Sequence, residues 1–237
     1  MKTLLAILIG LVAIYLFYSG IRFLSLLNVS KKLIEQATPF TQDSTDTSRA
    51  MLVLGDSTAV GVGASTVAES VPGRVAAHVG ATKVENYGVS GALVEDLPAQ
   101  AKRAALPRYE LILIQIGGND MVRFHGAVES ARLLGAVLEE LPEAGTVVVI
   151  SAADVGAARI FPHFIRPFYS ALNKRYHAAF ADAAREHGAI YVDLSEDPGS
   201  ELFATDPATY FAPDSFHPSS AGYGLWFDAI RPSLPVR

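Results

Sequence analysis

The sequence contains no cysteine, which excludes disulfide scaffolds, thiolate zinc sites and cysteine nucleophiles. Charge is also scarce, because only 18% of the 237 residues are charged while 50% are hydrophobic, and this composition excludes a disordered chain. Of the 19 basic and 24 acidic residues, five and three precede residue 50, so residues 50–237 carry a net charge of −7. An acidic body without a basic stripe predicts no nucleic-acid partner. No residue spacing indicates a metal site, and we expect no cofactor.

A long run without charge stands at the N-terminus, where residues 3–21 lie between Lys2 and Arg22. As a helix this run would be about 28 Å long, close to the thickness of a bilayer hydrocarbon core. It predicts one transmembrane helix. A cleaved signal peptide is the alternative, but the apolar run continues beyond Arg22 and no small-residue cleavage site follows it. We expect the N-terminus to stay inside the cytoplasm, so that the following domain is extracytoplasmic, on the periplasmic or cell-surface side.

Three regions follow from this composition. Residues 1–34 form the predicted anchor with its flank, and residues 35–49 are polar, rich in Ser and Thr, and typical of a linker. From residue 50 to residue 237, short β-branched runs alternate with helical patterns. Strands are predicted at 51–54, 83–87, 110–116, 146–151 and 189–194, and helices near 67–79, 94–104, 127–140, 167–187 and 219–231. This alternation predicts a three-layer α/β/α sandwich around a five-stranded parallel sheet.

Polar clusters follow three of the predicted strands, and a fourth precedes the last predicted helix. They are Gly55-Asp56-Ser57-Thr58, Asn86-Tyr87-Gly88-Val89-Ser90-Gly91, Gly117-Gly118-Asn119-Asp120 and Asp214-Ser215-Phe216-His217. Taken singly, each cluster is an ordinary turn or helix cap. Because active crevices in parallel sheets lie beyond the carboxyl ends of the strands, we expect all four clusters to meet at one rim.

Together the clusters supply every part of a site for nucleophilic catalysis by a serine hydroxyl. A hydroxyl nucleophile needs a base, the base needs a carboxylate, and the oxyanion needs fixed donors. Ser57 is the candidate nucleophile, His217 the candidate base and Asp214 the candidate carboxylate. The backbone N–H groups of Ser57 and Gly91 and the side chain of Asn119 are the candidate oxyanion-hole donors. No Gly-x-Ser-x-Gly elbow occurs, which argues against an α/β-hydrolase.

The four motifs, in this order, resemble those of the SGNH/GDSL hydrolase family of serine esterases and lipases. The resemblance extends from residue 51 to about residue 226. It implies a flavodoxin-like fold and the roles given above for Ser57, Asp214, His217, Gly91 and Asn119. Thr58 departs from the family pattern, in which this position is Leu, and the departure bears on substrate shape more than on mechanism.

The aromatic-rich stretch 160–169 suggests the kind of ester. It follows the fourth predicted strand and contains Phe161 and Phe164, which we expect to form an apolar wall for an acyl chain or a patch facing the bilayer. The leading hypothesis is a membrane-tethered serine hydrolase of the esterase or lipase type that cleaves carboxylic esters through an acyl-enzyme intermediate. Its expected substrate is a small ester or an acyl lipid. Two alternatives are an esterase that removes O-acetyl groups from cell-envelope polysaccharide and a catalytically silent, flavodoxin-like binding module.

Overall fold

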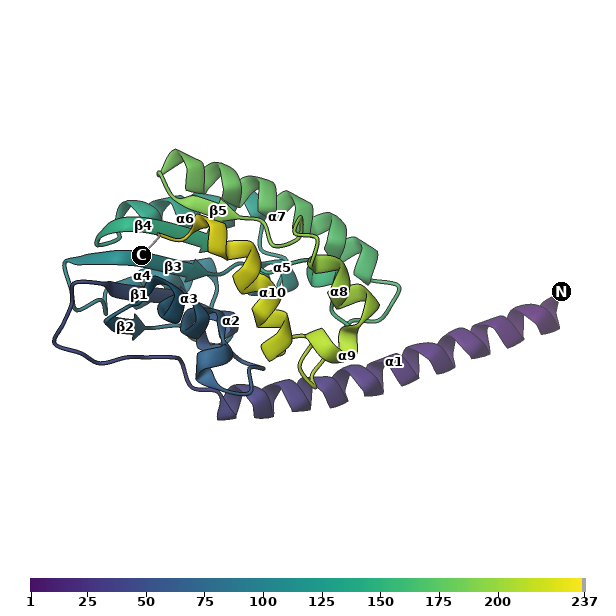
Figure 1. Ribbon diagram of the computed structural model, residues 1–237. Coiled ribbons are helices and arrows are strands. Elements are labelled where there is room, and N and C mark those ends of the chain that lie inside the picture. Colours follow the sequence, from purple (N-terminus) through teal and green to yellow (C-terminus); the bar gives the residue numbers. More distant parts are fainter. Residues whose placement is uncertain (236–237) are drawn as a thin grey trace.

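The computed structural model describes residues 1–235 and places a sheet between layers of helices, with a long N-terminal helix projecting from one side (Figure 1). The longer helices are α1 (Lys2–Gln36), α3 (Val71–Val79), α6 (Ala127–Glu139), α7 (Arg166–Glu186) and α10 (Ser220–Ile230). The shorter α-helices are α2 (Ser57–Val60), α4 (Leu97–Ala101), α5 (Gly118–Val122), α8 (Ser200–Thr205) and α9 (Pro207–Tyr210). Within the described residues, four 3-10 turns complete the set: η1 (Val67–Glu69), η2 (Val94–Asp96), η3 (Val155–Ala157) and η4 (Arg231–Ser233).

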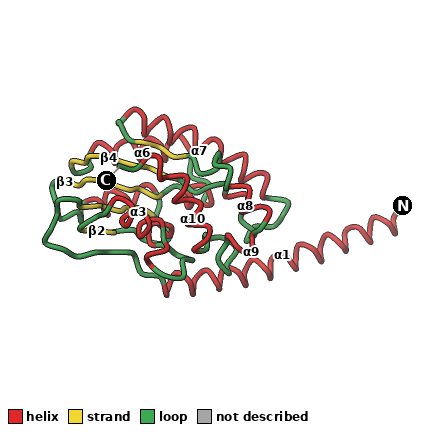
Figure 2. The backbone as a smooth tube through the Cα atoms, viewed as in Figure 1, coloured by secondary structure: helices red, strands yellow, loops and turns green. Residues whose placement is uncertain are grey.

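Five parallel strands form the sheet, in the order β2-β1-β3-β4-β5 (Figure 2). They are β1 (Ala50–Gly55), β2 (Lys83–Asn86), β3 (Arg108–Gln115), β4 (Glu143–Ile150) and β5 (Ile190–Val192). The strand order reverses at β1, because the chain moves from β1 to β2 on one side and then to β3 on the other. A crevice is expected beyond the carboxyl ends of the strands at such a reversal.

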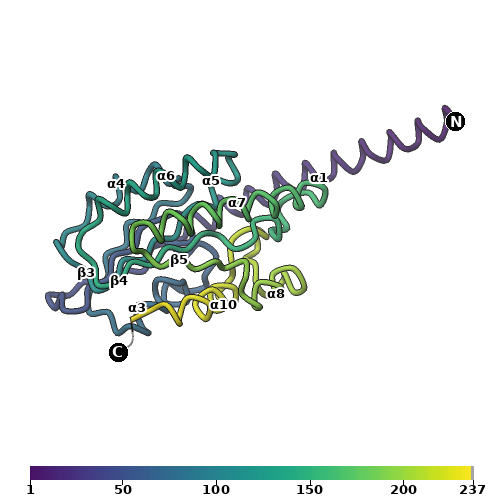
Figure 3. The backbone as a smooth tube through the Cα atoms, turned by 90° about the horizontal axis from the view of Figure 1, so that it is seen from above, coloured from purple at the N-terminus to yellow at the C-terminus, as the bar shows by residue number. Residues whose placement is uncertain are grey.

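Alternate residues of the central strands enter two separate cores, because successive side chains of a strand point to opposite faces. On one face, Leu52 and Ile112 pack with residues of α4, α6 and α7. On the other, Val53 and Leu113 pack with residues of α3 and α10. Figure 3 shows these two helix layers on opposite sides of the sheet. The predicted three-layer α/β/α sandwich with a five-stranded parallel sheet is therefore confirmed.

Two helices predicted as continuous are interrupted. The prediction at 67–79 becomes η1 and α3, because Ser70 adopts an extended backbone and its hydroxyl caps the N–H of Gly73. Pro72 then occupies the first turn of α3, where its missing N–H costs nothing. The prediction at 94–104 likewise becomes η2 followed by α4, which ends at Ala101.

Helix α1 is long and apolar enough to cross a membrane, by length and composition. Its first half is exposed on all sides, whereas Phe23, Leu26 and Leu27 pack against the core that contains α7. Residues 37–49 follow the outer edge of β2. There Gln42 pairs with Val84 through the backbone. The stretch predicted as a linker is therefore held against the domain.

Candidate active site

Ser57 lies at a tight turn between β1 and α2, with its side chain at the carboxyl edge of the sheet. Gly55 makes this turn possible, since its φ is +140° and a Cβ there would lie 2.0 Å from the Gln115 carbonyl oxygen. Asp56 caps α2 by accepting hydrogen bonds from the N–H and the hydroxyl of Thr58, at 2.9 and 2.8 Å. Burial raises the pKa of Asp56 to about 6, although the bonds from Thr58 oppose this shift. The first residue of α2 is therefore fixed in position.

The loop before α10 holds Asp214 and His217 together. One oxygen of the Asp214 carboxylate, Oδ1, accepts the backbone N–H groups of Phe216 and His217, both at 3.0 Å. Ser215 adopts a left-handed backbone, with φ of +58°, to close this turn. The second carboxylate oxygen, Oδ2, is thereby free to face the His217 ring.

Ser57, His217 and Asp214 form one continuous chain of hydrogen bonds. His217 Nε2 lies 2.9 Å from Ser57 Oγ, and His217 Nδ1 lies 2.6 Å from Asp214 Oδ2. All three residues are buried. Burial alone would raise the pKa of Asp214, but the hydrogen bonds from His217 and from two backbone amides together lower it. The carboxylate stays charged beside the ring, and an imidazole held in this way can accept the hydroxyl proton of Ser57.

Two contacts fix the Asp214–His217 loop against the Ser57 turn, although the two segments are 160 residues apart. Gly63 has a φ of +97°, and a Cβ at this position would lie 2.3 Å from the Pro218 carbonyl oxygen. Buried Tyr223 of α10 donates from its hydroxyl to the carbonyl oxygen of Val62, at 2.7 Å. The approach of the loop therefore depends on a glycine and a tyrosine that lie outside the four sequence motifs.

The two other candidate donors are Gly91, in the loop after β2, and Asn119, in the first turn of α5. Asn119 Nδ2 donates to the carbonyl oxygen of Ala92 at 3.0 Å, which uses one of its two amide hydrogens. Gly91 adopts a left-handed backbone with φ of +84°, and Arg123 donates to its carbonyl oxygen at 3.1 Å. Within residues 1–235, the backbone N–H groups of Ser57 and Gly91 donate no hydrogen bond to another part of the chain.

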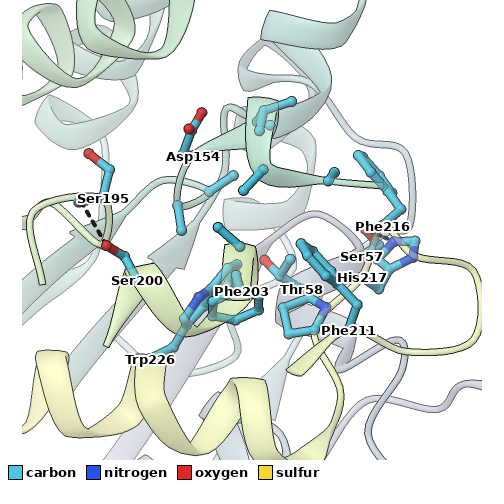
Figure 4. Close-up of a pocket in the computed structure, with 18 of the residues that line it drawn as sticks. Ser57, Thr58, Asp154, Ser195, Ser200, Phe203, Phe211, Phe216, His217 and Trp226 are labelled. Carbon is cyan, nitrogen blue, oxygen red and sulfur yellow. Dashed lines mark hydrogen bonds between the residues drawn. The ribbon is translucent and has the colours of Figure 1, made fainter. Parts of the chain in front are cut away.

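A pocket of about 260 Å³ opens beside Ser57, His217 and Asn119 (Figure 4). Its walls are largely apolar, and the bulky ones are Phe203, Phe211, Phe216 and Trp226. Ser195 and Ser200 lie at the end remote from Ser57, with Phe203 and Trp226 between (Figure 4). The arrangement offers an apolar space beside a hydroxyl that is hydrogen-bonded to a histidine. Over the same residues 1–235, no group of three or more histidine, aspartate or glutamate side chains is placed to hold a metal ion.

The structure does not bring Phe161 and Phe164 to this pocket, which corrects the expectation that they form its apolar wall. Phe161 is buried beneath the rim, where its ring packs on Tyr169 with centroids 4.4 Å apart and meets the edge of Phe216. Phe164 does not line the pocket, is 59% exposed and contacts Tyr15 of α1. The sequence could not show which side chains of this segment face the pocket, because an irregular segment has no fixed period that assigns residues to one face.

The aromatic walls come mainly from residues 203–226, which the sequence analysis had not assigned to the pocket. Helices α8 and α9 are only six and four residues long. Such lengths are too short for a hydrophobic period to be recognised. Phe216 lies inside the Asp214–His217 motif, and Trp226 falls on the predicted last helix, so the sequence placed these two residues near the site. No motif or predicted helix placed Phe203 or Phe211 near the site.

Several known proteins are similar to this chain. A GDSL-like esterase of Mycobacterium tuberculosis is 28% identical over 189 residues, which are 76% of this chain and 60% of that protein. The chain therefore spans less than two thirds of that relative's length. The acetylxylan esterase Axe2 of Geobacillus stearothermophilus, solved as a catalytic mutant, superposes with a TM-score of 0.61 at 19% identity, covering 82% of this chain and 98% of that one. Phospholipase A1 of Streptomyces albidoflavus gives a TM-score of 0.60 at 20% identity, covering 78% and 98%.

These two solved structures share the fold, and the family assignment rests on the sequence. The profile of the GDSL-like lipase/acylhydrolase family matches residues 53–225, which include Ser57, Gly91, Asn119, Asp214 and His217. The match covers well over half of the chain and nearly all of the sheet. This chain therefore belongs to the GDSL-like lipase/acylhydrolase family.

Proposed function

We propose that the protein is a serine hydrolase that cleaves carboxylic esters through an acyl-enzyme intermediate. The observation that carries this proposal is the chain of hydrogen bonds from Ser57 through His217 to Asp214, at 2.9 and 2.6 Å, beside an apolar pocket. In this mechanism Ser57 Oγ attacks the carbonyl carbon while His217 Nε2 takes its proton. The ester bond then breaks, and the same proton passes to the departing alcohol. Water then attacks the acyl-enzyme while His217 takes a proton from it. The bond to Ser57 Oγ breaks, and His217 returns the proton to Ser57 as the acid leaves.

Three donors are proposed for the tetrahedral oxyanion: the N–H groups of Ser57 and Gly91 and the side-chain amide of Asn119. Two observations support them. The backbone N–H groups have no acceptor elsewhere in residues 1–235, and Asn119 Nδ2 is anchored to Ala92 with one hydrogen left over. Fixed donors of this kind need no rearrangement when charge develops on the oxygen, which is why they stabilise the transition state.

The pocket walls support an acyl chain as the group that is bound. Alkyl chains gain up to about 0.8 kcal/mol for each methylene removed from water. The aromatic side chains of Phe203, Phe211 and Trp226 provide the surface for such burial, within a cavity at the small end of ligand pockets. We therefore expect esters of short to medium acyl chains to be preferred over acetate.

A series of p-nitrophenyl esters from acetate to palmitate, given to the full chain in a mild detergent, tests this proposal. We expect kcat/KM to rise by up to about fourfold per methylene over the first few carbons and then to level off as the cavity fills. Ala157→Phe should flatten the rise, because Ala157 lines the pocket and a phenyl ring would occupy it. Acetate turnover should change by less than about threefold, since the ring removes chain-binding space and not the reacting groups.

Ala178→Phe is the matched control, because Ala178 is exposed on α7 and lies outside the pocket. It should leave the whole series unchanged. A preference for acetate that Ala157→Phe does not alter would contradict an acyl-chain pocket. That result would favour the second candidate, an O-acetyl esterase acting on cell-envelope polysaccharide, a function that the fold shared with an acetylxylan esterase makes reasonable.

We further propose that α1 is retained as a single-pass anchor that holds residues 50–237 on the extracytoplasmic side, with residues 35–49 as the connection. Its second half supports retention, because Arg22 Nη1 donates to the Arg159 carbonyl oxygen at 2.6 Å and Ser30 is buried. Cleavage beyond Leu27 would detach Arg22, Phe23 and Leu26, which contact the domain. Carbonate extraction of membranes tests the anchor, since an integral protein stays in the pellet and a processed one is released.

A further inference from the structure

Three arginines from different parts of the chain gather where α1 leaves the domain. They are Arg22 of α1, Arg159 from the segment after η3, and Arg166 at the start of α7. Arg159 and Arg166 line one cleft together with His163 and Lys174. Arg22 joins them through its hydrogen bond to the Arg159 carbonyl oxygen. The cluster is basic, on a body whose net charge is −7.

No ion pair within residues 1–235 offsets this charge. Over residues 1–235, none of the three guanidinium groups lies within 4 Å of an acidic side chain. The Arg166 side chain makes no hydrogen bond to any other group within residues 1–235. The Nε atoms of Arg159 and Arg166 are buried without a partner there. Burial and the nearby charges of Arg159 and Arg22 lower the pKa of Arg166. Clustered cations with unused donors cost free energy, and a bound anion would offset that cost.

The position of the cluster along α1 indicates the kind of anion. Arg22 is the first charged residue after the apolar run 3–21. When that run spans the hydrocarbon core, Arg22 lies at the level of the lipid headgroups. Arg159 and Arg166 lie at the same level, because they contact or adjoin Arg22. Phosphate groups of lipids are the anions concentrated at this depth.

Exposed aromatic side chains beside the cluster reinforce this placement. Phe124, Phe164 and Phe168 are each more than half exposed, and Phe124 and Phe168 have their rings 5.9 Å apart. Phe164 meets Tyr15, which precedes Arg22 by seven residues and so lies about 10 Å deeper along the helix. Both Figure 1 and Figure 3 show the N-terminal turns of α1 projecting past the domain on this side. The segment 160–169 therefore reaches the bilayer interface, where aromatic rings are favoured.

We propose that Arg22, Arg159 and Arg166 form a binding site for the phosphate of an anionic phospholipid headgroup, with the exposed phenylalanines inserted beside it. The site goes beyond ester hydrolysis and rests on the proposal that α1 spans the membrane. It would hold the domain in one orientation on the bilayer surface. The free N–H groups of the three guanidiniums would donate to the phosphate oxygens, which arginine recognises through paired hydrogen bonds.

Binding is tested with the full chain in dodecyl maltoside micelles, using melting temperature as the readout so that no result depends on ester hydrolysis. We expect dioctanoyl phosphatidylglycerol to raise Tm in a saturable manner, because a ligand of the folded state stabilises it. Dioctanoyl phosphatidylcholine should raise Tm much less. Sodium phosphate at the same concentration should have almost no effect, and added salt should weaken the response to phosphatidylglycerol.

Arg166→Gln should weaken the apparent affinity for phosphatidylglycerol by about tenfold, the loss expected for a charge-assisted hydrogen bond. Arg22→Gln is the second variant, and the Tm of each variant without lipid shows whether it folds. Arg185→Gln is the matched control on the same helix, because Arg185 is exposed and paired with Asp182. Equal responses to the two lipids, an equal response to phosphate alone, or unchanged affinity in both Arg166→Gln and Arg22→Gln would each overturn the proposal.

Discussion

Ser57→Ala is expected to lower kcat for ester hydrolysis by roughly 10⁴–10⁶-fold, and His217→Ala by a similar factor. The reason is that Ser57 Oγ and His217 Nε2, 2.9 Å apart, act in one step: the hydroxyl cannot attack unless the ring removes its proton. What survives should be the catalysis supplied by binding and by the oxyanion donors. Steady-state hydrolysis of p-nitrophenyl butyrate by each purified variant measures both effects.

The double variant Ser57→Ala/His217→Ala should be scarcely slower than either single variant, because members of such a unit do not contribute additively. Ser48→Ala and His78→Ala are the matched controls, since both residues lie outside the pocket, and each should retain the activity of the unmodified chain. Additive losses in the double variant would mean that Ser57 and His217 serve separate steps. The proposed mechanism would then be wrong.

Asn119→Ala should lower kcat by roughly 10²–10³-fold and leave KM nearly unchanged, because an oxyanion donor is used in the transition state and hardly at all in the ground state. Asn119→Asp keeps the shape of the side chain but places a carboxylate against the developing negative charge. It should therefore be at least as slow. The two variants together separate electrostatic stabilisation from simple loss of packing.

A structural role for Asn119 has a different signature. Its amide also holds the carbonyl oxygen of Ala92, so removing it will lower Tm to some degree. If that contact were its whole contribution, Tm would fall while kcat in the folded fraction stayed the same. An unchanged kcat in Asn119→Ala would thus remove Asn119 from the catalytic proposal.

The sequence predicted the fold and the clustering of candidate residues well, because both follow from local patterns. Strands buried on both faces leave continuous apolar runs, such as 110–116, and a parallel sheet brings the ends of its strands to one edge. Ser57 and Asn119 each follow such a strand, and the spacing of Asp214 and His217 already allowed a hydrogen bond between them. Their meeting required no knowledge of side-chain packing.

The substrate pocket was harder to predict, because its walls are set by tertiary contacts. Phe203 and Phe211 belong to short segments without a recognisable period, while the conspicuous aromatic stretch 160–169 turns toward α1. The gathering of Arg22 with Arg159 and Arg166 was equally hidden, since it depends on α1 packing along the domain. Arg22 and Arg159 are 137 positions apart, and no sequence pattern predicts a contact over such a separation.

Labelling with a fluorophosphonate tests most directly the claim that Ser57 is an activated nucleophile. The reagent phosphonylates a serine hydroxyl that a neighbouring base has activated, with loss of fluoride, and its use requires no knowledge of the natural ester. We predict one stoichiometric adduct, located at Ser57 by peptide mass spectrometry, and its loss in Ser57→Ala. His217→Ala should slow labelling by several orders of magnitude. Absence of label from the folded chain would contradict the account and favour a binding module that performs no catalysis. An adduct on another serine would also contradict it, because the activated nucleophile would then not be Ser57.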